Sequence, residues 1–144
     1  MKYQTEAEYV EDAHRRLCEM GIPCMMEVPC LGRSVDLAFI MDGMIYSVEF
    51  KLRNWRKALQ QARDHQLGAD YSFICMCEYP TTVKMKVAAI ALGIGVFSFL
   101  NNDGYPFSVT VTGAVSSVQW RIAREKLACL ISGALEREDE NADT

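Results

Sequence analysis

The sequence predicts an α/β domain with one mixed central sheet and helices on both sides of it. Two observations lead to this prediction. Segments whose apolar residues recur at helical spacing are interspersed with shorter apolar segments of strand length, and turn residues separate them. With 144 residues, of which 50% are hydrophobic and 24% charged, the chain has the size and composition of a single globular domain.

The first half of the chain is expected to fold as a helix, three strands and a second helix. Thr5 can cap the first helix and Gly21 can end it. The dipeptide Asp42-Gly43 is typical of a tight hairpin turn between the second and third strands. Asn54 can cap the second helix. The predicted elements are 5–20, 24–28, 33–40, 44–52 and 54–67.

The second half is expected to add a strand, a helix, two strands and a final helix. The strand at 70–77 is almost entirely apolar, so we expect it to be buried on both faces and parallel to a neighbour. Gly93 can end the helix that follows, and Ser116 or Ser117 can cap the last one. The predicted elements are 70–77, 81–92, 96–100, 107–111 and 115–135.

Charge is unevenly distributed along the chain. The formal net charge is −4, and residues 136–144, with five acids and one base, account for all of it. We therefore expect a domain over 1–135 and a disordered acidic tail over 136–144. Between residues 51 and 63 the chain carries five basic residues and no acid, so a local basic surface can attract phosphates despite the acidic total.

The cysteines and the apolar segments indicate a cytoplasmic protein without a membrane span. The six cysteines form no CxxC pair, and neither His14 nor His65 lies at a spacing typical of zinc sites, so the sequence gives a zinc site little support. We expect reduced and mostly buried thiols. No apolar segment reaches the roughly 18 residues that a membrane span requires, and the N-terminus lacks a signal-peptide pattern.

Three ionisable residues interrupt two neighbouring apolar strands. Asp36 lies in the strand before the hairpin turn, and Glu49 and Lys51 lie in the strand after it. Because side chains alternate along a strand, Glu49 and Lys51 share one face, and pairing through the turn brings Asp36 close to Glu49. Adjacent carboxylates repel unless a cation or a proton joins them, so the pattern favours a divalent-metal site. An exposed ion pair between Glu49 and Lys51 on an edge strand is the alternative.

These residues resemble the D…ExK signature of the PD-(D/E)XK nuclease superfamily. Val35-Asp36 stands in place of the Pro-Asp pair, and Glu49-Phe50-Lys51 follows thirteen residues later. The helix from Asn54 to His65 is similar to the Trp-x-x-Ala-Leu-x-Gln-Ala helix of several branches, among them Holliday-junction resolvases and RecB-type nucleases. The resemblance covers roughly residues 5–100. It implies a restriction-endonuclease-like core with the element order α-β-β-β-α-β.

The resemblance also implies roles for individual residues. Asp36, Glu49 and the Phe50 carbonyl would bind Mg²⁺ or Mn²⁺, with Glu11 as the favoured further ligand and Glu6 and Glu27 as alternatives. Lys51 would orient or deprotonate the attacking water, and Gln61 would position phosphate or water. The nucleic-acid contacts would come from a basic and polar set: Arg33, Arg53, Arg56, Lys57, Arg63 and His65.

The function expected from these assignments is hydrolysis of DNA phosphodiester bonds by a metal-dependent nuclease. The resemblance is also compatible with a homodimer. The alternative is a catalytically inactive nuclease-like module that binds nucleic acid or a partner protein. Gln61 and His65 also have an ordinary interpretation as residues of a helix surface, and Trp55 is expected to anchor the helix in the core rather than stack on a base.

Overall fold

The computed structural model describes residues 5–78 and 80–142, and the side chains of residues 134–142 are not among those described. The described residues form the predicted mixed α/β architecture, in which four helices flank one six-stranded sheet. The elements in order are α1 (Glu6–Glu19), β1 (Cys24–Cys30), β2 (Arg33–Met41), β3 (Met44–Lys51), α2 (Trp55–His65), β4 (Tyr71–Met76), α3 (Val83–Leu92), β5 (Gly95–Phe99), β6 (Phe107–Val111) and α4 (Arg121–Ala142).

The strands lie in the sheet in the order in which they occur in the chain. β1, β2 and β3 are antiparallel neighbours, β3, β4 and β5 are parallel, and β6 returns antiparallel to β5. The tight turn between β2 and β3 forms as predicted, with Asp42 and Gly43 both at positive φ (53° and 75°). β4 is parallel to both of its neighbours and almost fully buried, as its apolar sequence predicts.

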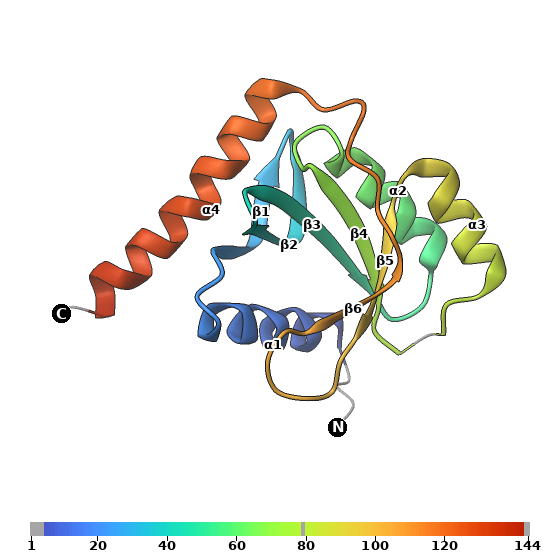
Figure 1. Ribbon diagram of the computed structural model, residues 1–144, viewed down its shortest axis with the longest axis horizontal. Helices are drawn as coiled ribbons and strands as arrows, with labels where there is room; N and C mark the ends of the chain where they lie inside the picture. Colours follow the sequence, from blue (N-terminus) through green and yellow to red (C-terminus); the bar gives the residue numbers. More distant parts are fainter. Residues whose placement is uncertain (1–4, 79, 143–144) are drawn as a thin grey trace.

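One helix covers one face of the sheet and three cover the other (Figure 1). The α1 face buries the even-numbered residues of β3, such as Val48 and Phe50, together with Leu17 of the helix. On the opposite face α2 and α3 pack over β4 and β5, and α4 packs over β1 and β2. The alternation of side chains along β3 therefore directs Glu49 toward α2.

Local capping interactions explain where three of the helices begin. The Thr5 hydroxyl accepts a hydrogen bond from the Glu8 N–H, and the Asn54 side chain accepts one from Lys57 N–H. Thr82 caps α3 in the same way through the Met85 N–H. These side chains satisfy backbone donors that the first turn of a helix leaves unpaired, so the helix starts are set by local sequence.

The last helix differs from its prediction at both ends. Residues 112–120 are irregular instead of helical, because their backbone bonds to the loop after α2: Trp120 N–H donates to the Leu67 carbonyl, and Ser116 N–H donates to the Asp70 carbonyl. At the other end α4 continues to Ala142, where we expected a disordered tail from residue 136; Leu135, Glu136, Arg137 and Glu138 are residue types that favour helix. Residues 143–144 lie outside the described chain. Within the described residues, no helix combines the length and the apolar character needed to cross a membrane.

Candidate functional site

A cavity of about 520 Å³ opens where the C-terminal end of β3 meets α1, β1, β2 and α2. Its walls bring together residues that are far apart in the sequence and that are mostly acidic or amide-bearing. The lining residues are Glu6, Ala7, Val10, Glu11, Met26, Glu27, Asp36, Glu49, Phe50, Lys51 and Gln61. The cavity thus contains every predicted metal ligand, all three candidate glutamates and the predicted catalytic residues.

The cavity lies where the pairing of β2 with β3 stops. The described ladder between these strands runs from Met41 opposite Met44 to Leu37 opposite Val48. At Asp36, the residue before Leu37, a side chain takes the place of the backbone as hydrogen-bond acceptor. The Asp36 Oδ2 accepts a hydrogen bond from the Phe50 N–H at 2.9 Å. This bond fixes the Asp36 carboxylate beside β3, next to Glu49, as the hairpin register predicted.

Glu49 is buried, with 2% of its surface exposed. Burial, followed by the charge of Asp36 and a side-chain hydrogen bond with it, raises the pKa of the Glu49 carboxyl group to about 9, although the charge of Lys51 acts to lower it. At neutral pH the metal-free protein therefore holds a proton on the carboxyl pair. The arrangement matches the sequence-based expectation that two adjacent carboxylates need a proton or a cation between them.

Three buried polar atoms around Glu49 have no hydrogen-bond partner among the described residues: Glu49 Oε1, Gln61 Oε1 and His65 Nδ1. His65 Nδ1 lies 3.8 Å from Glu49 Oε1. An unsatisfied polar atom in a protein interior costs roughly 1–3 kcal/mol, so a cluster of three is unusual in a purely structural region. Two of the three, on Glu49 and Gln61, belong to residues that line the cavity.

His65 is buried in the protein interior, whereas a direct contact with nucleic acid requires an exposed side chain. Only 2% of its surface is exposed, because His65 lies on the buried face of α2 together with Leu59 and Ala62. Burial lowers the pKa of its imidazole, which is therefore neutral at physiological pH. The structure thus places His65 behind Glu49 as a neutral buried group, and its contact with nucleic acid stays a prediction.

Lys51 and the candidate glutamates surround the mouth of the cavity. Lys51 Nζ lies 3.9 Å from Glu6 Oε2, so α1 and β3 are linked across the opening. Glu6, Glu11 and Glu27 all line the cavity, and the geometry gives no preference to Glu11. Glu27 differs from the other two in its backbone, which has a φ of 51°, an uncommon value for a residue other than glycine and one that is often found at functional sites.

The donor set fits a hard divalent cation. Carboxylate, amide and carbonyl oxygens are the ligands that Mg²⁺ and Mn²⁺ prefer, and Asp36, Glu49 and Gln61 supply the first two kinds. The orphaned Glu49 Oε1 is an oxygen ligand that the described side chains leave unused. A cation beside it would replace the proton that the carboxyl pair otherwise holds.

The basic residues predicted to contact nucleic acid are spread over several surfaces. Among the described residues, none of them lines the cavity with Asp36 and Glu49. Arg53 and Arg56 line a separate hollow of about 560 Å³ beside Trp55, and the guanidinium of Arg56 lies 4.3 Å from the Trp55 ring centroid. Lys57 is exposed on the same turn of α2. Arg33 is exposed and lies 3.8 Å from an Asp64 carboxylate oxygen.

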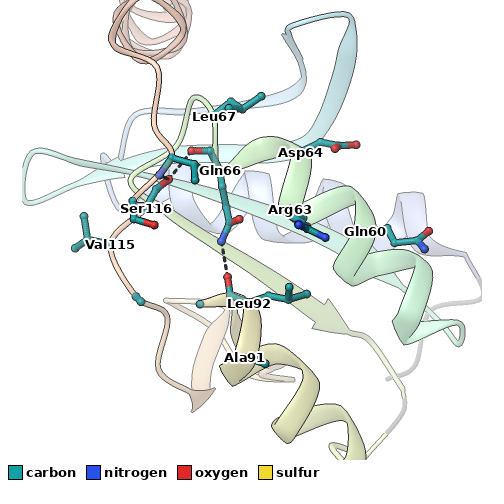
Figure 2. A pocket seen from close by; sticks show the side chains of 13 residues that line it. Gln60, Arg63, Asp64, Gln66, Leu67, Ala91, Leu92, Val115 and Ser116 are labelled. Carbon is teal, nitrogen blue, oxygen red and sulfur yellow. Dashed lines mark hydrogen bonds between the residues drawn. The ribbon is translucent and has the colours of Figure 1, made fainter.

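Arg63 lines a different and larger cavity, of about 730 Å³, between α2, α3 and residues 114–118. Figure 2 shows that Gln66 spans this cavity, where its side-chain amide donates to the Leu92 carbonyl at 2.8 Å. Ser116 closes the other side through its bond to the Gln66 carbonyl. Since this cavity contains no carboxylate pair among the described residues, we place the candidate site at the smaller one.

A second group of possible ligands was missed by the sequence analysis. His14, Cys18 and Cys24 have donor atoms that all lie within 4.8 Å of one another, although the sequence spacing gave a zinc site little support. The spacing rules fail because Cys24 comes from a strand and the other two from a helix. The i, i+4 spacing of His14 and Cys18 on an expected helix was the available signal.

No protein-family model matches the sequence, and no curated protein matches it. A solved structure that is similar is the crystal structure of AF1548, described as a protein of unknown function, with a TM-score of 0.50 and 19% sequence identity. The match covers 69% of this chain and 61% of that chain, so this chain spans less than two thirds of its length. At this level of identity the likeness concerns the fold alone.

Proposed function

We propose that the chain is a metal-dependent nuclease that hydrolyses DNA phosphodiester bonds at the cavity containing Asp36 and Glu49. The observation that carries the proposal is the carboxyl pair formed by the buried Glu49 at the end of β3 and the half-buried Asp36 of β2. Glu49 is almost fully buried, its pKa is raised to about 9, and its Oε1 has no hydrogen-bond partner among the described residues. Strongly perturbed carboxyl groups in a cavity are typical of functional sites.

The arrangement of the chain's own groups supports this role. The hydrogen bond from Phe50 N–H holds Asp36 in place, so both carboxylates are fixed by strands rather than by loops. The Gln61 amide, whose Oε1 is buried at the same cavity, can position water or a phosphate oxygen. The Lys51 ammonium, at the mouth, can donate hydrogen bonds to a phosphate oxygen or orient the attacking water when it moves from Glu6.

Asp36 and Glu49 would hold the divalent cation, with Gln61 or one of the three glutamates able to contribute further oxygen. A bound Mg²⁺ or Mn²⁺ stabilises negative charge that develops on a phosphate during hydrolysis. Exposed Arg53, Arg56 and Lys57 follow directly after Lys51 and would contact the DNA backbone. Such contacts position a duplex without reading its sequence, so the proposal is for cleavage without a fixed recognition sequence.

The alternative of an inactive nuclease-like module has one observation in its favour. Lys51, which the nuclease would need at the phosphate, lies 3.9 Å from Glu6 in this structure. If that ion pair persists when nucleic acid binds, the site would hold both a cation and the nucleic acid without hydrolysing the nucleic acid. Binding and cleavage must therefore be measured on the same protein.

The test is a calorimetric titration with Mg²⁺ and Mn²⁺ beside a nicking assay on duplex, single-stranded and branched DNA. We expect Asp36→Ala and Glu49→Ala to lose both metal binding and cleavage. Lys51→Ala should lose cleavage but keep or increase its metal affinity, because the substitution removes a positive charge near the ion. Asp64→Ala, an exposed acid on α2, serves as the matched control and should change neither property.

Two results would decide against the nuclease. Wild-type protein that binds neither cation and cuts none of these substrates would exclude the enzyme. Wild-type protein that binds the cation through Asp36 and Glu49 but cuts nothing would favour the inactive module. Circular dichroism of each variant checks that a lost activity does not reflect a lost fold.

A further inference from the structure

His14, Cys18 and Cys24 form a compact group of soft donors away from the carboxylate cavity. Cys18 Sγ lies 3.6 Å from His14 Nε2 and 3.3 Å from Cys24 Sγ. His14 and Cys18 lie one turn apart on α1, and Cys24 is the first residue of β1. The three donor atoms all lie within 4.8 Å of one another. The connection of residues 20–23 brings the strand back beside the helix.

These distances are close to those of a tetrahedral zinc site. With Zn–S near 2.3 Å and Zn–N near 2.0–2.1 Å, tetrahedral angles place two sulfur ligands about 3.8 Å apart and a sulfur and a nitrogen ligand about 3.5 Å apart. The Cys18–Cys24 separation of 3.3 Å needs a shift of about half an ångström and the Cys18–His14 separation of 3.6 Å one of about a tenth. The donor atoms of His14 and Cys24 lie within 4.8 Å of each other and must approach to complete the site. A disulfide between the same cysteines would need a larger shift, to about 2.05 Å, and would leave the imidazole without a role.

The surroundings also suit a metal ligand set. Cys24 is 4% exposed and packs in the core cluster between α1 and the sheet, so it is held in place. His14 and Cys18 are partly exposed, which gives an ion a route from solvent. Two thiolates and a neutral imidazole match Zn²⁺ in softness, in contrast to the oxygen donors of the Asp36 and Glu49 cavity.

We propose that His14, Cys18 and Cys24 bind one Zn²⁺ ion that joins α1 to β1. Among the described side chains the cluster has these three donors, so the fourth position of the tetrahedron is left to water or to a donor outside that set. The ion links the helix that carries Glu6 and Glu11 to the strand that carries Glu27, and so stabilises two walls of the carboxylate cavity. The proposal does not depend on the nuclease function.

The test is a titration of the reduced, chelator-stripped full chain with Co²⁺, followed by Zn²⁺. We expect a thiolate-to-cobalt charge-transfer band that saturates at one equivalent and is abolished by Zn²⁺. Cys18→Ser and His14→Gln should each weaken zinc affinity by more than about a hundredfold, because loss of a supporting contact alone already costs about 10–100-fold. Zn²⁺ should raise the Tm of the wild type and leave that of Cys18→Ser unchanged.

Two control variants separate this site from other binding. Cys129→Ser removes an exposed thiol on α4 and should keep the full cobalt band. Glu49→Gln alters the carboxylate cavity and should keep it as well. The proposal is overturned if the reduced wild type gives no charge-transfer band, or if either control loses as much zinc as Cys18→Ser. A Cys18–Cys24 disulfide in protein purified without reductant, with no zinc bound after reduction, would identify the pair as a redox couple instead.

Discussion

Glu49 in β3 and Asp70 just before β4 are both almost fully buried, with 2% and 5% of their surfaces exposed, but their partners differ. Asp70 accepts two hydrogen bonds from the Arg124 guanidinium, each at 2.9 Å, and others from Gln119 and the Ile45 N–H. Burial acts to raise the Asp70 pKa, and these bonds together outweigh it, so the pKa is lowered. The pKa of Glu49 is raised to about 9.

The comparison shows that this fold can neutralise a buried carboxylate. At Asp70 the guanidinium of Arg124 in α4 neutralises the carboxylate, and this ion pair links the last helix to the sheet. At Glu49 the neighbour is a second carboxylate, Asp36, and one oxygen remains unsatisfied within the described structure. Uncompensated burial costs stability, and proteins tolerate this cost mainly where a ligand or a reaction uses the group.

The largest effect that this comparison predicts is the pH dependence of metal binding. A cation at Glu49 must displace a proton from a group whose pKa is about 9, so Mg²⁺ affinity should rise by about tenfold per pH unit between pH 6 and 8. Calorimetry in buffers of different ionisation enthalpy should show the release of about one proton per ion. An affinity that does not change over this range would show that Glu49 is already ionised.

The second prediction concerns stability without metal at pH 7. Glu49→Gln should stabilise the protein by up to a few kcal/mol, because the native state no longer has to keep a proton that the unfolded state has released. Asp70→Asn should destabilise it by about 2–3 kcal/mol, because the charged hydrogen bonds to Arg124 are lost. Urea unfolding measures both changes. Two changes of the same sign would remove the distinction between the carboxylates.

The pH dependence of these two variants should also be opposite. The raised pKa of Glu49 makes wild-type stability fall with increasing pH between about 4.5 and 9, so the advantage of Glu49→Gln should grow over that range. The lowered pKa of Asp70 contributes stability above its unfolded value of 3.8, and this contribution is lost as the pH falls through the folded value. The deficit of Asp70→Asn should therefore shrink in acid.

The smallest predicted effect compares two arginines of α4. Arg124→Ala leaves Asp70 buried without its cation and should cost about 2 kcal/mol, less than for a fully buried pair because the Arg124 side chain is 32% exposed. Arg121 pairs with Glu125 on the helix surface with 89% of its side chain exposed, and Arg121→Ala should cost less than about 0.5 kcal/mol. Equal costs in thermal or urea unfolding would mean that Arg124 does not neutralise Asp70.

The sequence by itself determined the elements that depend on neighbours along the chain. The caps at Thr5 and Asn54 and the turn at Asp42-Gly43 involve residues within a few positions, so local rules predicted them. The turn also fixed the register of β2 and β3, which is why the adjacency of Asp36 and Glu49 could be predicted from spacing.

Only the tertiary structure decided the features that depend on contacts between distant segments. His65 is buried because α2 turns that side toward the sheet, although the spacing of His65 from Gln61 had suggested a site residue. The helix α4 starts at Arg121 instead of the predicted residue 115, because the backbone before it bonds to the loop after α2. The group formed by His14, Cys18 and Cys24 depends on how α1 packs against β1. Sequence spacing carries no record of such packing, because burial and approach across the core are set by the whole fold.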